Sequence, residues 1–273
     1  MIIDAHAHAC GVFLDANGIL EILDLNKVDK VVLVPGEYGS TKNYSLPDIA
    51  SRFPNTDVIK YTNMMTKIII GISGTSKHID KGNDYVFTLK QAFPDRIIQF
   101  YWHKLLKQGG VDLLERKFKE CQFKGIKFHQ CWESFKIDSE EFDVAAEWAC
   151  SKDLPVFVHL YSKKSVFQMM SYLKNHPRTN FIIGHLFGLE HYIREGMDLE
   201  NMFFEISTPQ LISIERLKKA INYFGAQRVL FGSDTPYGLD NQKTNMERIL
   251  SLNITQLEKE KILGHNMKQL LRL

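Results

Sequence analysis

Eight short apolar segments with the composition of β-strands recur along the chain, and they constrain its fold more than any other feature. Residues 31–34 are typical, because they form a β-branched run that ends at Pro35 and Gly36. Continuous apolar runs of this length are typical of strands buried on both faces, as in parallel sheets. The predicted strands cover residues 1–8, 31–34, 96–102, 123–129, 155–160, 181–185, 203–206 and 229–231.

Helical patterns alternate with these strands from residue 83 onward. Ser139 precedes one helix as an N-cap, and Thr255 with Glu258 forms a capping box in the closing helical region. This alternation over 273 residues predicts an α/β fold, a (β/α)8 TIM barrel in which residues 1–273 form one domain. A doubly wound open sheet is the alternative, which the chain length disfavours. The predicted helices cover residues 83–93, 111–121, 139–152, 164–175 and 214–224, and two more follow the last strand.

Residues 36–81 interrupt the alternation. They contain Gly, Ser, Asn and Pro around an apolar run at 68–72, and they exceed the usual length of a connection. Two interpretations are open: an insertion that forms a lid over the site, or an ordinary surface excursion.

Charge and cysteine content narrow the classes of function. The net charge is +2 with dispersed Lys and Arg, and no apolar run reaches 18 residues, so neither a nucleic-acid partner nor a membrane span is predicted. The four cysteines form no CxxC pair, which is typical of reduced thiols. Asp4 and His6 interrupt the first apolar stretch, so no signal peptide is predicted. We therefore expect a cytoplasmic protein that acts on a small molecule.

Five of the predicted strands end at, or are closely followed by, a histidine or an aspartate. In a barrel, the carboxyl ends of the strands form the active face, so these side chains are expected to meet there. His6 shares a face of the first strand with His8, because side chains two residues apart point the same way. The five residues at strand ends are His8, His129, His159, His185 and Asp234.

His6 and three of the strand-end residues form a ligand set for one divalent metal ion. They are His6, His8, His159 and Asp234, a set that suits zinc, with manganese, iron or cobalt as alternatives. A metal ion of this kind would activate water, whose proton Asp234 would accept as the general base. His185 would polarise the substrate or relay a proton. In the alternative interpretation, these histidines are core or capping residues that bind no metal.

The same motifs resemble the amidohydrolase superfamily, in particular its amidohydrolase-2 branch, which also contains ACMSD-like decarboxylases. The resemblance implies a metal-dependent barrel in which the four ligands bind one ion and His185 is catalytic or lies just behind the ligands. It is also compatible with a homodimer. The resemblance is carried by residues 4–8, 83–96, 125–129, 154–159, 184–185, 232–236 and 262–266.

The resemblance leaves three functions open. The first is hydrolysis of a C–O or C–N bond in a small carboxylated or cyclic substrate by metal-activated water. The second is metal-dependent, non-oxidative decarboxylation. The third is a barrel that binds a ligand without catalysis, which the intact ligand set disfavours.

Four further residues are candidates for binding substrate. Lys127 has three open roles: a carbamylated bridge between two metal ions, an amine that binds an anionic substrate together with His129, or a buried partner of a carboxylate. Glu205 is expected to face inward and to orient a ligand or pair with a cation. Tyr237 would contact the substrate or pack at the rim.

Overall fold

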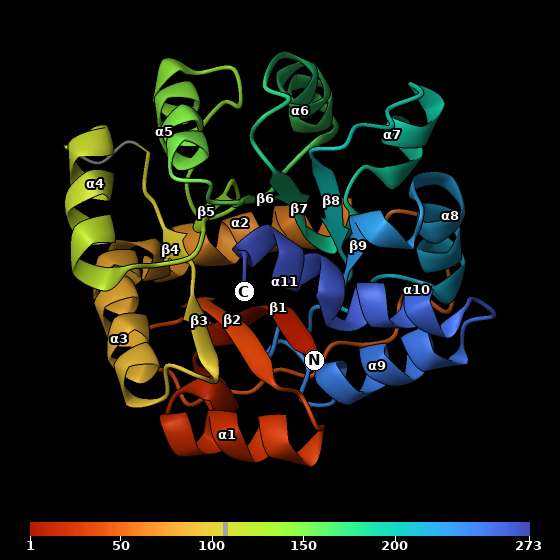
Figure 1. Ribbon diagram of the computed structural model, residues 1–273, viewed down its shortest axis with the longest axis horizontal. Helices are drawn as coiled ribbons and strands as arrows, with labels where there is room; N and C mark the ends of the chain where they lie inside the picture. The colour runs from red at the N-terminus through yellow and green to blue at the C-terminus, as the bar shows by residue number, and fades with distance from the viewer. Residues whose placement is uncertain (106–108) are drawn as a thin grey trace.

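Two parallel sheets form the centre of the computed structural model, which describes residues 1–105 and 109–273 (Figure 1). The smaller sheet has the order β1 (Ile3–Ala9), β2 (Lys30–Pro35), β3 (Ile97–Gln99). The larger sheet has the order β4 (Tyr101–Trp102), β5 (Ile126–His129), β6 (Val156–His159), β7 (Phe181–Ile183), β8 (Met202–Glu205), β9 (Val229–Leu230). Every predicted strand is confirmed, and the prediction at 96–102 corresponds to both β3 and β4.

Backbone hydrogen bonds join the two sheets at both edges. Only Phe100 separates β3 from β4; its N–H donates to Leu33 O at 3.1 Å, whereas Tyr101 N–H donates to Gly125 O at 2.9 Å. At the other edge, His8 N–H donates to Thr235 O at 2.8 Å. The hydrogen bonding therefore connects β2 to β5 through one continuous segment and β1 to the segment after β9, as a (β/α)8 barrel requires.

The helices surround the strands, with α11 in front of them and α2 behind them in Figure 1. The N-cap at Ser139 and the capping box at Thr255 are both confirmed. Helices α1, α2 and α7 lie outside the prediction, and in the described residues three helices follow β9 where two were predicted. Within the described residues, no helix combines the length and apolar character that a membrane span requires. The helices other than α2 are α1 (Ala16–Leu25), α3 (Ile79–Ala92), α4 (Gly110–Cys121), α5 (Glu140–Ser151), α6 (Lys163–Asn175), α7 (Leu189–Arg194), α8 (Ile214–Phe224), α9 (Asn241–Ser251), α10 (Gln256–Glu260) and α11 (Asn266–Leu271).

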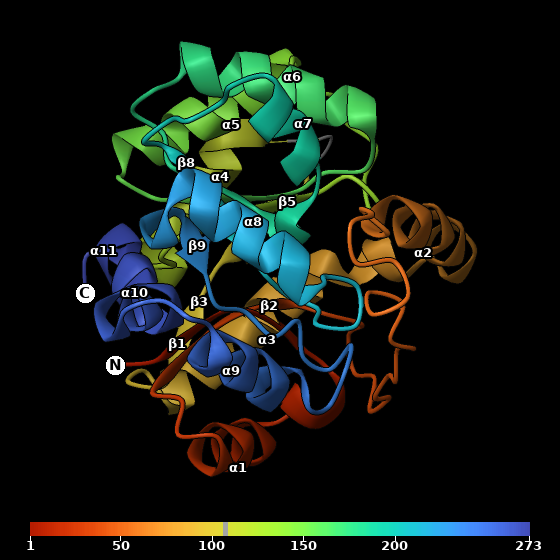
Figure 2. The same cartoon turned by 90° about the vertical axis from the view of Figure 1, so that its right-hand side faces the viewer.

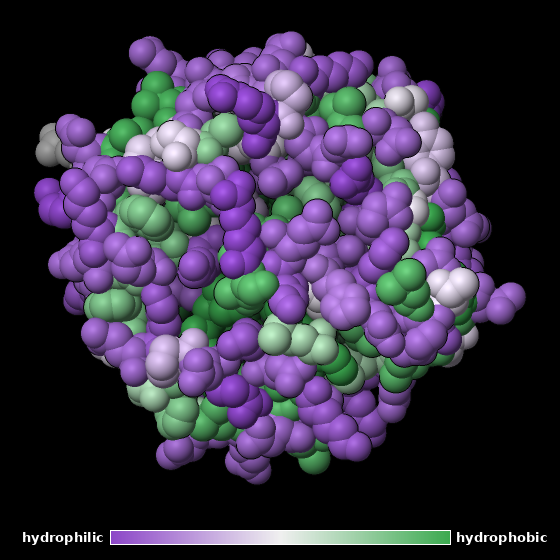
Figure 3. Space-filling view, in the orientation of Figure 1, coloured by the Kyte–Doolittle hydropathy of each residue, from purple (hydrophilic) through white to green (hydrophobic). Residues whose placement is uncertain are grey.

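The barrel interior is apolar near the amino ends of the strands and polar near the carboxyl ends. Buried Ile3, Phe157 and Ile182 belong to one cluster with Met267 and Leu270 of α11, so this helix packs against the barrel interior. The face of the molecule shown in Figure 3 is mostly hydrophilic. Helix α11 thus lies at the amino ends of the strands, opposite the polar carboxyl ends.

A helix that the sequence analysis missed lies inside the segment 36–81. It is α2 (Ile59–Ser73), which projects from the side of the barrel in Figure 2. Its inner face is buried through Ile59, Asn63 and Ile70, yet Ile72 on its outer face is 83% exposed. Apolar residues on both faces hide the helical period, which explains why the sequence pattern is ambiguous here.

Candidate metal centre and active site

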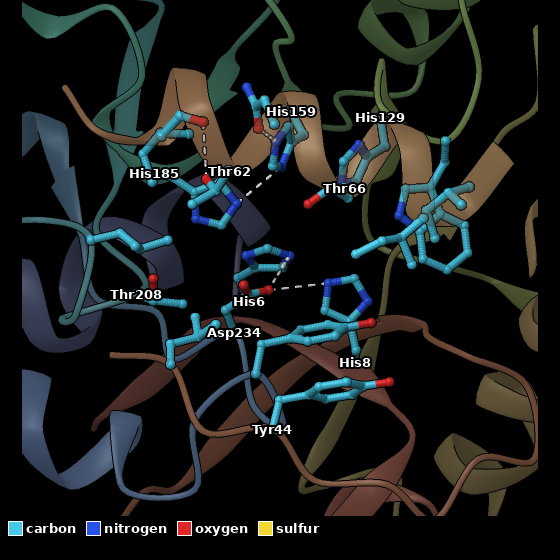
Figure 4. A pocket seen from close by; sticks show the side chains of 18 of the residues that line it. His6, His8, Tyr44, Thr62, Thr66, His129, His159, His185, Thr208 and Asp234 are labelled. Atoms are coloured by element: carbon cyan, nitrogen blue, oxygen red, sulfur yellow. Dashed lines mark hydrogen bonds and ion pairs between the residues drawn. The ribbon is translucent and has the colours of Figure 1, made fainter. Parts of the chain in front are cut away.

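A cavity of about 260 Å³ lies at the carboxyl ends of the strands, and the predicted histidines and residues of α2 line it (Figure 4). His6, His8, His129, His159, His185 and Asp234 all line it, as predicted for strand ends in a barrel.

Three side chains converge at the floor of this cavity. The ligand atoms of His6, His8 and Asp234 all lie within 4.8 Å of one another. Asp234 Oδ1 is 3.5 Å from His6 Nε2 and 3.2 Å from His8 Nε2. Two imidazole nitrogens and a carboxylate oxygen aimed at one place are a donor set that suits a divalent transition metal.

The rear nitrogens of both imidazoles face oxygen atoms. His8 Nδ1 is 2.7 Å from Pro35 O, and because a carbonyl only accepts, this nitrogen carries the proton and donates it. His6 Nδ1 faces Glu205 Oε2 at 3.5 Å and Ser207 Oγ at 3.4 Å. Such partners fix the tautomer of metal-binding histidines and direct the lone pair of Nε2 toward the ion.

Burial sets the protonation of these groups. It lowers the pKa of His6 and of His8, with a further lowering from the Lys127 charge. Burial alone would raise the pKa of Asp234, but its interactions with His8, His185 and Lys127 outweigh burial and lower that pKa. Neutral imidazoles beside an ionised carboxylate are the protonation state that metal binding requires.

His159, the predicted fourth ligand, has a different set of neighbours. Its Nε2 donates to Asn63 Oδ1 at 2.7 Å, since the Asn63 amide nitrogen is committed to the Leu160 carbonyl at 2.9 Å. Its Nδ1 lies 3.0 Å from His185 Nε2. The structure thus brings three predicted ligands together and places His159 beside them, against an α2 residue that sequence reasoning did not single out.

His185 and Asp234 share an uncommon backbone conformation. Their φ angles are 63° and 57°, in the left-handed region that non-glycine residues seldom occupy. Such conformations persist where the surrounding structure enforces them, and they cluster at active sites. His185 is further fixed through Nδ1, which is 2.8 Å from Ser207 O.

Lys127 points inward, as both active roles proposed for it require. It is fully buried, with Nζ 2.5 Å from His6 Nε2 and 3.4 Å from His8 Nε2. Burial lowers its pKa to about 7, although Asp234 and Glu205 favour the charged form. The amine therefore lies among the metal-binding imidazoles. His129 lines the cavity instead, with its ring stacked on that of His159 at 3.7 Å.

Glu205 is also fully buried and lies behind the histidines. Its Oε1 accepts a hydrogen bond from Ser207 N–H at 2.5 Å, and Oε2 accepts one from His185 N–H at 3.3 Å. Burial raises its pKa to about 8. A Cβ at Gly232 would lie 2.1 Å from Glu205 Oε1, so only glycine leaves room for this carboxyl group.

Tyr237 lies on the cavity wall, where its ring is edge-on to His8 with centroids 5.3 Å apart. The ring of Tyr44 lies beside it at 5.2 Å. Figure 4 shows Tyr44 on the same side of the cavity as His8 and Asp234.

Asp4 connects the strand that carries His6 to the loop that carries Asp234. It is fully buried; its Oδ1 accepts from Ser233 N–H, and its Oδ2 from Gln242 Nε2, both at 2.9 Å. Burial raises its pKa to about 6. Its place in the Asp-Ala-His-Ala-His motif was the only signal of this role in the sequence.

Two amides of α9 hold the same loop. Asn241 Nδ2 donates to Ser233 O at 2.9 Å, and Asn245 Nδ2 donates to Gly232 O at 2.8 Å. Both are fully buried, and their spacing of four residues places them on one helix face. Sequence reasoning missed them, although paired amides shortly after Asp234 were the available signal.

Comparisons with known proteins agree with this geometry. The model of the amidohydrolase family (Amidohydro_2) matches residues 72–273. A comparison with curated protein sequences gives no match.

Three solved structures resemble the chain along nearly its whole length. A 2,6-dihydroxybenzoate decarboxylase from Rhizobium has 15% identity and a TM-score of 0.70, over 99% of this chain and 98% of that one. A 5-carboxyvanillate decarboxylase from Novosphingobium aromaticivorans, complexed with manganese and a nitrobenzoic acid, has 12% identity and a TM-score of 0.68, over 100% and 96%. A probable 2-pyrone-4,6-dicarboxylic acid hydrolase from Acinetobacter baumannii, with citric acid bound, has 14% identity and a TM-score of 0.68, over 100% and 99%. At these identities the likeness shows the shared fold.

Proposed function

Because the chain belongs to the amidohydrolase family, we propose that it hydrolyses a C–O or C–N bond of a small carboxylated or cyclic substrate with one divalent metal ion. The observation that carries this proposal is the convergence of His6 Nε2, His8 Nε2 and Asp234 Oδ1 on the cavity floor.

The donor set favours zinc, and manganese is the first alternative because the similar 5-carboxyvanillate decarboxylase holds it. His6, His8 and Asp234 would hold the ion, and we propose His159 as the fourth ligand. When bound, the ion would polarise the scissile group and lower the pKa of a nearby water.

The protein groups around the floor then have distinct tasks. Asp234 is ionised and presents one oxygen to the two imidazoles, so its carboxylate is available to accept the proton of the attacking water. His185 is held through Nδ1 and presents Nε2 toward His159, from where it could orient the substrate or relay that proton. Glu205 would act through its hydrogen bonds to the backbone of His185 and Ser207, as a positioning residue.

Decarboxylation is the second candidate, because the similar solved structures include two decarboxylases, of 2,6-dihydroxybenzoate and of 5-carboxyvanillate. The same floor would hold the ion, and His185 would be the candidate proton donor to carbon. Lys127 is proposed to stay an amine beneath the imidazoles; a carbamylated Lys127 would instead bridge two ions.

We also propose that residues 1–273 form one domain in which 36–81 is a lid, since α2 contributes Ile59, Asn63 and Ile70 to the cavity wall. We further propose that the protein is cytoplasmic and forms a homodimer.

The experiment is metal analysis followed by a substrate panel. Purified wild type should hold one equivalent of transition metal, and His6→Ala should lose it while keeping the circular dichroism spectrum of the folded protein. Two equivalents would instead indicate carbamylated Lys127.

The metal-loaded protein is then assayed on aryl esters, lactones and amides, and on aromatic carboxylates with CO₂ detection. Release of acid or alcohol supports the hydrolase, and release of CO₂ supports the decarboxylase. Failure to bind metal after reconstitution would overturn both.

A further inference from the structure

We infer that the cavity selects a cyclic substrate that carries a hydrogen-bond donor, neutral or cationic, over a carboxylated one, and that Glu37 sets this preference. The inference rests on the proposed function, because the metal ligands define where the reacting bond lies.

Most of the cavity wall is apolar, so it suits a ring-containing substrate. Two of the apolar side chains come from the buried face of α2, and others approach from the loops after β2, β5 and β8. An apolar wall binds a ring by removing its surface from water, at about 25 cal/mol per Å². The apolar lining residues are Leu46, Ile59, Ile69, Ile70, Trp132 and Leu211.

The ionisable side chains that line the cavity, within the described part of the chain, are two acids, five histidines and two tyrosines, and none of them is a lysine or an arginine. Asp234 is committed to the metal-binding floor. Glu37 is the second acid, and it places a carboxylate on the wall beside that floor. A substrate carboxylate near this wall would therefore face a like charge, which a donor group would not.

Two lysines near the cavity are engaged elsewhere. Lys127 Nζ lies beneath the floor, against His6, and the side chain is fully buried. Lys67 of α2 lies over the ring of Tyr161, with Nζ 4.3 Å from the ring centroid. Neither ammonium group is therefore placed to pair with a substrate carboxylate that lies against the wall at Glu37.

Glu37 is fixed in place. It lies two residues after the end of β2, and its Oε1 accepts a hydrogen bond from the Tyr44 hydroxyl at 2.6 Å. The Tyr44 ring lies 5.2 Å from that of Tyr237, which in turn is edge-on to His8. This chain of contacts places the carboxylate at a set position relative to a metal ligand.

The Glu37 carboxylate has capacity for the substrate. A carboxylate can accept about four hydrogen bonds, and the Tyr44 hydroxyl supplies one. A hydroxyl or amine on the substrate ring could donate to the remaining sites. The substrate class is thus a small cyclic or aromatic ester, lactone or amide with a hydroxyl or ammonium substituent.

The test uses three benzohydroxamates that differ only in the meta substituent: hydroxymethyl, aminomethyl or carboxy. The hydroxamate group chelates the metal in each, so the differences in Kd between them report on the wall. Binding is measured by calorimetry on metal-loaded wild type, on Glu37→Gln, and on Glu21→Gln as a control for the loss of one charge, because Glu21 is an exposed residue of α1.

We expect wild type and Glu21→Gln to bind the hydroxymethyl and aminomethyl probes at least about tenfold more tightly than the carboxy probe, as a charge-assisted hydrogen bond implies. Glu37→Gln should reduce that ratio several-fold. A carboxy probe that binds wild type as tightly as the others, or a ratio unchanged in Glu37→Gln, overturns the inference.

The matching aryl acetates, assayed for hydrolysis, separate this inference from the proposed function. Selective hydroxamate binding without ester hydrolysis would keep the inference and refute the hydrolase. Hydrolysis with a preference for the carboxy ester would keep the hydrolase and refute the inference.

Discussion

Gly232→Ala should destabilise the protein through one contact, between the new methyl group and Glu205. The added Cβ would lie 2.1 Å from Glu205 Oε1 and 2.8 Å from Cδ, both far inside van der Waals contact. Glu205 is fully buried, and its two oxygens accept the N–H groups of Ser207 and His185. The carboxyl group therefore cannot move away without giving up those hydrogen bonds.

Two effects set how far Gly232→Ala lowers the free energy of unfolding. Overpacking a buried site costs about 1–3 kcal/mol. Leaving the buried N–H group of Ser207 or His185 without its acceptor costs about 1–3 kcal/mol. We expect the free energy of unfolding to fall by about 3–5 kcal/mol, since relaxation will preserve part of the Glu205 network.

The assay is a double-mutant cycle, in which urea unfolding gives the free energy of unfolding of each variant. In a Glu205→Ala background the methyl group has space, so Gly232→Ala should then cost less than about 1 kcal/mol. The coupling energy between the two sites would be at least about 2 kcal/mol. An equal cost of Gly232→Ala in both backgrounds would refute the reasoning, because the strain would then lie in the backbone. Metal affinity is a second readout: displacement of Glu205 from behind His6 should weaken it about 10–100-fold.

Four more predictions concern the site, its supports and the ion pair of Glu115 with Lys152. Asp234→Asn should abolish turnover and leave the far-UV circular dichroism spectrum that of the folded protein, which a substrate assay and spectroscopy will check. Asn245→Ala removes the donor to the Gly232 carbonyl and should lower the free energy of unfolding by about 1–3 kcal/mol, whereas the exposed control Asn55→Ala should change it by less than about 0.5 kcal/mol. Chelation of the metal should lower the stability by about 2.7 kcal/mol if the free ion was at 100 times its Kd, so an unchanged unfolding temperature in EDTA would count against a bound ion. The Lys152 hydrogen bond lowers the pKa of Glu115 to about 2 from a usual value near 4.5. The stabilisation by this ion pair is therefore present above pH 4.5 and is lost as the pH falls toward 2. In Glu115→Gln, the unfolding temperature should fall less between about pH 5 and 2 than it does in wild type.

The sequence alone determined the barrel and the identity of most candidate ligands. Both depend on local patterns: strand composition recurs between helices, and alternation places His6 and His8 on one face of a strand. Parallel strands share a carboxyl edge, so residues at strand ends meet whatever the details of packing.

Only the tertiary structure decided which of those side chains converge. His159 Nε2 donates to Asn63, a residue 96 positions earlier in a helix whose period the sequence concealed. The loop of Asp234 is held by Asp4 and by amides of α9, and Gly232 is required by Glu205 of another strand. Each of these contacts joins residues that lie far apart in the sequence, so no local pattern reports it. The periodicity of a strand or helix sets the direction in which a side chain points. The packing of the whole fold decides which residue it meets.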